Sequence, residues 1–205
     1  MEFDLTVTFG VFAAIIVAGV GAGTLERALP GRTAAALAEA LDARVEWLAI
    51  GRSGAAGRYI AQHMLTEIEK ARFDVIVVSA GVNDLISLHS LARWRKDLAA
   101  LLHALSGRWP DAAIAFSGLP PMQCFPALPE PLRSLIGMRA RQFDLVLRET
   151  IAACPQAIHL PLGFVADRQS FSGDGFHPSE ASYATFGRIA ADALAGHVDQ
   201  PRSTS

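Results

Sequence analysis

Short apolar runs alternate with longer amphipathic stretches along most of the chain. The apolar runs predict buried strands, and the stretches whose apolar positions recur every three or four residues predict helices. The predicted strands are 45–50, 75–79, 112–117 and 157–160, preceded by a first strand within 5–18. The predicted helices are 25–41, 57–71, 90–108, 132–153 and 179–194, the last with Ser179 as N-cap. This alternation is typical of βαβ units, so we expect a three-layer α/β/α sandwich around five parallel strands.

Composition is consistent with one globular domain. The chain has 205 residues, of which 51% are hydrophobic and 19% charged, and we expect a domain over 1–196 with a polar tail over 197–205. The net charge of −2 gives no reason to expect a nucleic acid or an anionic membrane as partner. Two cysteines, Cys124 and Cys154, lack metal-ligand spacing and predict reduced thiols and a cytoplasmic location.

Residues 9–23 carry no charge, a pattern that is typical both of targeting segments and of buried strands. A signal peptide begins with basic residues, whereas Glu2 and Asp4 precede this run. Fifteen residues are also fewer than a membrane-spanning helix needs. We therefore expect no membrane span here, and interpret the run as a buried parallel strand that leads into a glycine-rich turn.

A proline-rich loop is predicted after the fourth strand. Residues 118–131 contain five prolines, which exclude both helix and central strand. The loop leaves the carboxyl end of a strand, where open α/β sheets bind ligands. We expect Met122, Phe125 and Leu128 to line an apolar substrate pocket; a rigid surface connection is the alternative.

Three polar segments follow predicted strands at the same edge of the sheet: Gly51-Arg52-Ser53-Gly54, Gly81-Val82-Asn83-Asp84 and Asp174-Gly175-Phe176-His177-Pro178. Each one alone is also typical of a turn or a helix cap. Their order and their places at the strand ends make the combination more specific than any single segment.

With these three segments the sequence, from Ala18 to about Leu194, resembles the SGNH hydrolases, the GDSL-type esterases and lipases. The resemblance implies a flavodoxin-like sheet with strand order 2-1-3-4-5 and a small-molecule carboxylic ester or thioester as substrate. It implies that the Gly54 N–H and the Asn83 amide stabilise an oxyanion, and that Asp174 and His177 are the catalytic acid–base pair. It implies no cofactor, and no His, Asp or Glu cluster in the sequence has the spacing of metal ligands.

The nucleophile of that family is missing from this chain. Counting back from the small-residue stretch 18–24, the Gly-Asp-Ser positions fall on Ala13, Ala14 and Ile15, and no serine precedes Ser53. In that family the backbone N–H at the serine position is a third oxyanion donor, and Ile15 still has this N–H. Its side chain, however, cannot attack a carbonyl. We therefore expect an inactive or strongly impaired esterase. Three explanations stay open: a ligand-binding module that has lost catalysis, hydrolysis by another route, or a first segment of seventeen residues that stems from a wrong start or reading frame.

A dinucleotide-binding turn is the alternative from another functional class. Gly19, Gly21 and Gly23 follow an apolar strand and precede a predicted helix, as in turns that bind a pyrophosphate. The third glycine comes one residue early for that motif, and no acidic residue ends the second strand. This alternative also leaves Asn83, Asp174 and His177 without a role.

Overall fold

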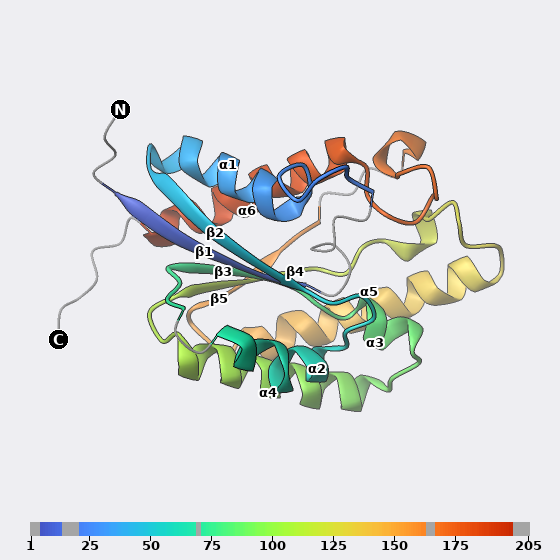
Figure 1. Cartoon of the computed structure of the whole chain (residues 1–205). Coiled ribbons are helices and arrows are strands. Elements are labelled where there is room, and N and C mark those ends of the chain that lie inside the picture. Colours follow the sequence, from blue (N-terminus) through green and yellow to red (C-terminus); the bar gives the residue numbers. More distant parts are fainter. Residues whose placement is uncertain (1–4, 14–20, 69–70, 163–166, 199–205) are drawn as a thin grey trace.

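A computed structural model of the chain describes residues 5–13, 21–68, 71–162 and 167–198. Within this part, five strands form one parallel sheet in the order β2-β1-β3-β4-β5, as expected from the sequence (Figure 1). The strands are β1 (Thr6–Ala13), β2 (Arg44–Gly51), β3 (Val75–Ser79), β4 (Ala113–Ser117) and β5 (Ala157–Leu160). All five carboxyl ends therefore lie at one edge of the sheet.

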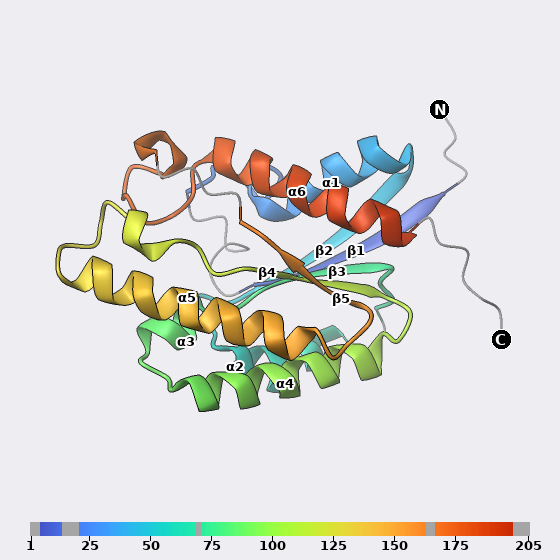
Figure 2. The same cartoon turned by 180° about the vertical axis from the view of Figure 1, so that it is seen from behind.

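Helices cover both faces of the sheet (Figures 1 and 2). The helices α1 (Leu29–Leu41) and α6 (Glu180–Val198) pack together on one face. The other face carries α2 (Gly57–Gln62), α3 (Val82–Ile86), α4 (Leu91–Arg108) and α5 (Leu132–Ile151). None of the helices in the described residues is long and apolar enough to cross a membrane. The three-layer arrangement predicted from the alternating pattern is confirmed.

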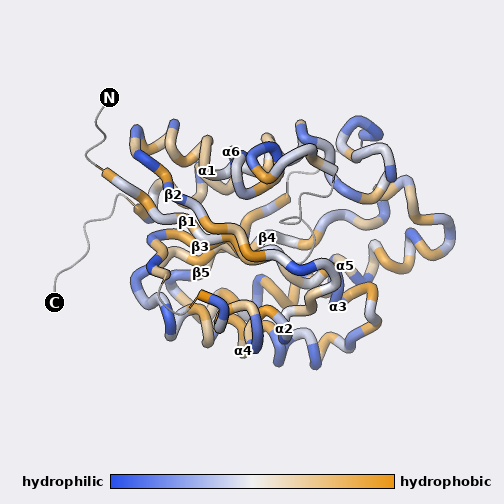
Figure 3. The backbone as a smooth tube through the Cα atoms, viewed as in Figure 1, coloured by the Kyte–Doolittle hydropathy of each residue, from blue (hydrophilic) through white to orange (hydrophobic). Residues whose placement is uncertain are grey.

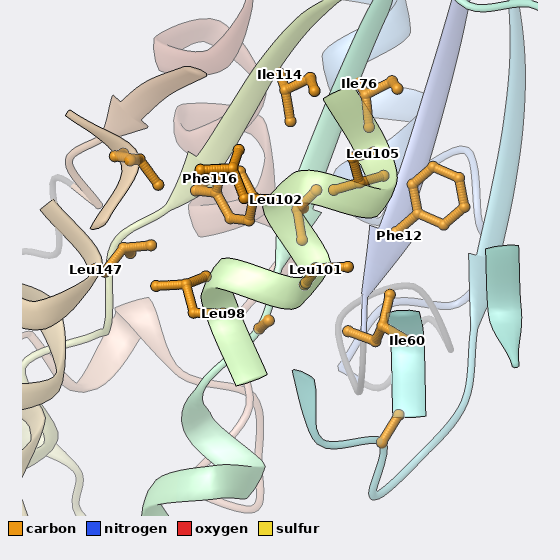
Figure 4. Close-up of a cluster of buried hydrophobic side chains, with 14 of the residues drawn as sticks. Phe12, Ile60, Ile76, Leu98, Leu101, Leu102, Leu105, Ile114, Phe116 and Leu147 are labelled. Atoms are coloured by element: carbon orange, nitrogen blue, oxygen red, sulfur yellow. The ribbon is translucent and has the colours of Figure 1, made fainter. Parts of the chain in front are cut away.

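Two hydrophobic clusters hold the layers together, one on each face of the sheet. Side chains alternate along a strand, so Phe9 and Val11 join the cluster under α1 and α6, whereas Phe12 joins the opposite one. In that second cluster Phe12 and Ile76 of the sheet meet Leu105 of α4 (Figure 4). Burial on both faces explains why the inner strands are almost continuously apolar, as the hydropathy colouring also shows (Figure 3).

The boundaries of several helices differ from the prediction. The helix expected over 57–71 ends at Gln62 and is followed by a separate 3-10 turn, Met64–Ile68. The helix expected from residue 25 begins at Leu29, because residues 24–28 form turns and Pro30 suits a first helical turn. The short α3 was not predicted. Helix α6 continues to Val198 and so includes the start of the tail expected from residue 197.

The close approach of α6 to α1 depends on Gly187. A Cβ at this position would lie 2.7 Å from the carbonyl carbon of Arg32, closer than packed atoms come. We predict that Gly187→Ala lowers the free energy of unfolding by about 1–3 kcal/mol through overpacking. Gly196→Ala on the same helix, where a Cβ would meet no described atom within 4 Å, should be neutral or stabilise by up to about 1 kcal/mol. Urea unfolding of both variants tests this, and equal losses would contradict it.

Candidate active site

A tight turn directly before α6 carries the predicted acid and base. The Ser172 N–H donates to the His177 carbonyl oxygen at 2.7 Å, and Phe171 and Pro178 form an antiparallel bridge that closes the turn. Gly175 lies in the left-handed region with φ of +66°, a conformation that glycine adopts without strain. Helix α6 follows at once, with its Ser182 N–H 3.4 Å from the Ser179 hydroxyl, in agreement with the predicted cap. The turn is thus anchored to a long helix.

Asp174 and His177 contact each other within this turn. The distance from His177 Nδ1 to Asp174 Oδ2 is 2.5 Å, and Asp174 Oδ1 accepts hydrogen bonds from the His177 N–H and the Phe176 N–H. Because the carboxylate occupies Nδ1, Nε2 is the ring nitrogen left to accept a proton. The spacing of three residues thus produces an oriented acid–histidine pair.

The surroundings of Asp174 keep it ionised. Its partial burial acts to raise the pKa, but the hydrogen bonds from the His177 ring and from backbone N–H groups outweigh this and hold the pKa of Asp174 well below its ordinary value. The Ser172 hydroxyl adds a further bond of 2.7 Å to Oδ1. Burial, followed by the Asp174 charge, raises the pKa of Tyr183, which therefore stays neutral. Sequence reasoning named neither Ser172 nor Tyr183.

The proline-rich loop packs against the turn that carries Asp174 and His177. Phe125 packs edge-on against Phe171 and Phe176 at centroid distances of 5.0 and 5.3 Å, and the Ala127 N–H donates to the Gly175 carbonyl. Met122 and Phe125, which we expected to line a substrate pocket, are buried among core side chains, and Leu128 is partly buried. Their role as pocket-lining residues stays a prediction.

An open pocket of about 400 Å³ lies beside the Asp174 turn. The proline-rich loop contributes Pro126 and Ala127 to its wall, and the opposite side includes Arg168, Ser172 and Asp174. The loop therefore reaches a cavity next to the acid–histidine pair through different residues from those expected.

Gly54 and Asn83, the predicted oxyanion donors, lie in the turn after β2 and in helix α3, which a hydrogen bond joins. The Asn83 amide donates to the Ala55 carbonyl oxygen at 2.9 Å, and Asn83 is buried at the start of α3. Gly54, adjacent to Ala55, has φ of +80°, and a Cβ there would meet no described atom within 4 Å. The Gly54 N–H therefore belongs to an exposed turn whose position the Asn83 side chain holds.

Gly81 and Asp84 of the Gly-Val-Asn-Asp motif have structural roles, one in close packing and the other in hydrogen bonding. Gly81 has φ of +106°, and a Cβ there would lie 3.1 Å from Trp94. Asp84 is fully buried and uses both oxygens: Oδ2 accepts the Gly57 N–H at 2.9 Å, and Oδ1 lies 3.0 Å from His89 Nδ1. Asp84 thus fastens the start of α2 to the motif. In the sequence, only the position of Asp84 within the Gly-Val-Asn-Asp motif pointed to a role for this residue.

Asp84, His89 and Asp97 also form the one group, within the part of the chain that the structure describes, whose ligand atoms could hold a metal ion. Their atoms lie within 4.8 Å of one another, a proximity that the sequence spacing does not reveal. Asp84 and His89 already bind each other, and Arg93 forms an ion pair with Asp97. These contacts explain, without a metal ion, why the three side chains lie close together.

Gly21 connects the segment after β1 to the histidine turn. It has φ of +88°, and a Cβ there would lie 2.4 Å from the Pro178 carbonyl oxygen and 3.4 Å from His177 Cβ. Only glycine permits this approach. Ile15, which the motif register places at the nucleophile position, lies outside the described residues. Convergence of Gly54 and Asn83 with His177 into one site therefore stays a prediction.

Asp144 and His159 form a further acid–histidine pair near the exit of β4. His159 Nε2 is 2.9 Å from Asp144 Oδ1, which also accepts the Leu119 N–H at 3.0 Å. Burial acts to raise the pKa of Asp144, but the bonds from His159 and Leu119 and the charge of Arg148 lower it. These partners of Asp144 come from β5, α5 and the start of the proline-rich loop, so the pair holds the start of that loop against the sheet and α5.

Comparison with known proteins agrees with this fold. The family model of the GDSL-like lipase/acylhydrolase family matches residues 16–185. No curated protein matches the sequence. Among solved structures, a lipase from a goat rumen metagenome superposes with a TM-score of 0.75 at 18% identity, covering 94% of this chain and 100% of that one.

Two esterases show the same likeness. A family 3 carbohydrate esterase of Clostridium thermocellum has a TM-score of 0.71 at 18% identity, covering 94% of this chain and 100% of its own. The psychrotrophic esterase EstA of a Pseudoalteromonas species has a TM-score of 0.68 at 13% identity, with coverages of 92% and 96%. These identities establish the shared fold alone. The match of the family model over most of the length shows that this chain belongs to the GDSL-like lipase/acylhydrolase family.

Proposed function

We propose that this chain carries the binding and proton-transfer half of an ester-hydrolase site, directed at carboxylic esters or thioesters. The observation that carries the proposal is the contact between His177 Nδ1 and Asp174 Oδ2, which orients Nε2 for proton transfer. Membership of a hydrolase family and the hydrogen bond that joins Asn83 to the turn of Gly54 support it.

In this proposal each group acts at a definite atom. His177 Nε2 takes the proton from an attacking hydroxyl and returns it to the leaving group, while the Asp174 carboxylate stabilises the charged ring. The Gly54 N–H and the second hydrogen of the Asn83 amide donate to the oxygen that becomes negative in the tetrahedral intermediate. Each such donor is worth about 3–4 kcal/mol of transition-state stabilisation in comparable enzymes.

The chain as written lacks the nucleophile that this chemistry needs. Ile15 stands in the serine position of the motif, so no acyl-enzyme can form through it. The Ser172 hydroxyl donates to Asp174, on the acid side of the pair, and Ser53 precedes the oxyanion glycine on another turn. We therefore propose a strongly impaired esterase whose remaining groups still bind an ester-like ligand.

The sequence and contacts after position 15 support the proposal that the chain keeps the other groups of the site although the nucleophile is missing. The family model matches from residue 16 onward, directly after the motif position that Ile15 occupies. Gly21, six residues later, makes the close approach to Pro178 that only glycine permits. The chain at Gly21 therefore lies against the histidine turn.

The dinucleotide-binding alternative gains no support. Helix α1 begins at Leu29, several residues after the glycines, so they do not form its N-terminus. The Gly23 N–H is 3.2 Å from the Glu180 carboxylate, and a pyrophosphate would meet that negative charge.

Restoring the motif tests the proposal. We predict that Ala13→Gly/Ala14→Asp/Ile15→Ser raises ester hydrolysis by several orders of magnitude, toward the roughly 10⁶-fold effect of a serine nucleophile. The matched control, Ala13→Gly/Ala14→Asp alone, should stay near the background rate. Adding His177→Ala to the restored chain should abolish the gain, and a burst of product should accompany activity only when the introduced hydroxyl and His177 are both present. Robust hydrolysis by the unmodified chain would overturn the assignment.

The substrate class is tested on the same restored variant. We predict hydrolysis of p-nitrophenyl esters with short or medium acyl chains and a decline for long ones, as expected of an acyl pocket bounded by the proline-rich loop. Rates are measured as kcat/KM across the series. Equal rates at all chain lengths would argue against an acyl pocket.

The lowered pKa of Asp174 predicts a pH dependence of stability. Its contribution to the free energy of unfolding should be present above the ordinary pKa of 3.8 and be lost as the pH falls toward the lower folded-state value. Urea unfolding of the unmodified chain and of Asp174→Asn measures this difference at several pH values. We expect the gap to shrink as the pH falls below 3.8, with the exposed Asp111→Asn as control for the loss of one charge. A gap that does not change with pH would contradict the charged role of Asp174.

A further inference from the structure

Five large apolar side chains are exposed together near the carboxyl edge of the sheet. We call them the α3–α5 patch: Ile86, Leu88, Leu132, Leu135 and Met138, each 44–75% exposed. Leu132, Leu135 and Met138 are spaced three apart and so share one side of α5. The Arg139 guanidinium donates to the carbonyl oxygen of His89 at 2.8 Å, which ties the turn after α3 to this part of α5 (Figure 1).

Leu88 is exposed at a backbone position that disfavours it. It is 75% exposed and has φ of +57°, at the end of α3, where glycine or asparagine usually stands. Folding therefore gains nothing from a leucine here, since the side chain is neither buried nor suited to the backbone. The Leu88 side chain is therefore free to make a contact outside the folded chain.

The charge around the patch indicates what that contact is. Segments 86–96 and 130–142 contain six lysines and arginines and one acidic residue, Glu130, in a chain whose net charge is −2. Arg93 and Arg95 are paired with Asp97 and Glu149, which lie outside these segments. Within the part of the chain that the structure describes, the uncompensated positive charges are therefore those of Lys96, Arg139 and Arg141. Glu130 is bound by Arg133 and Ser134. A second copy of the chain would bring like charges together across a symmetric interface, whereas an anionic surface would be attracted. The net charge of the whole chain conceals this local excess.

We propose that the α3–α5 patch docks on an anionic phospholipid bilayer. The apolar side chains enter the boundary between headgroups and acyl chains, and the surrounding arginines contact the headgroup phosphates. Both α3 and α5 begin at the carboxyl edge of the sheet, so docking holds the candidate active site against the membrane surface. The surface binding requires no ester hydrolysis and stands apart from the proposed function.

The experiment is co-sedimentation of the unmodified full chain with vesicles. We expect binding to vesicles of equal parts phosphatidylcholine and phosphatidylglycerol, little binding to phosphatidylcholine alone, and weakening as salt rises. Leu88→Asn/Leu135→Ser/Met138→Ser should lower the partition coefficient about tenfold or more, since each side chain contributes up to about 1.5–3 kcal/mol when buried. Arg133→Gln/Arg141→Gln should lower it about tenfold, at about 1 kcal/mol per charge.

Matched controls separate docking from folding. Leu48→Ser and Arg44→Gln change exposed residues on β2, outside the patch, and should leave vesicle binding unchanged. Leu88→Asn alone should keep or raise the free energy of unfolding, because asparagine tolerates positive φ, and still weaken binding. No binding to anionic vesicles, equal binding to neutral ones, or equal losses in the β2 controls would overturn the proposal. A dimer in solution that the triple variant dissociates, without vesicle binding, would assign the patch to self-association instead.

Discussion

The parallel pairing of β1 with both β2 and β3 is the constraint on which the site depends. It brings the ends of three strands to one edge, so the segments that follow them emerge side by side. Burial stabilises this placement, because Phe9 and Phe12 of β1 point into the cores on opposite faces. The sheet thus positions the chain segments that carry Gly21, Gly54 and Asn83.

Buried polar groups then determine how those segments are held. Asn83 and Asp84 are buried, and each would destabilise the fold without a hydrogen-bond partner. Their partners, the Ala55 carbonyl and the Gly57 N–H, belong to the turn after β2 and the start of α2. The histidine turn is organised separately, around the two oxygens of Asp174 and the packing of Phe125 beneath it. The two predicted parts of the site are therefore stabilised independently of each other.

Local patterns determined much of this protein directly. Strand positions followed from continuous apolar runs, because strands buried on both faces have no polar side, and the range 75–79 agrees with β3 at both ends. The pairing of Asp174 with His177 was also predictable, since a turn brings residues three apart into contact. Helix boundaries were less predictable: the apolar pattern indicated neither the end of α2 at Gln62 nor the short α3.

Other features were decided only by the tertiary structure. Nothing in the local sequence shows that Asp84 fastens Gly57, that Asp144 pairs with His159, or that Met122 and Phe125 face the core. Each of these depends on which segments the sheet brings together, over separations of 15 residues or more for the two aspartates. Periodicity and motif spacing report the conformation of a segment and the chemistry it carries. Burial and contact between distant side chains arise only when the layers pack, so the sequence determined the site's components and the tertiary structure determined their partners.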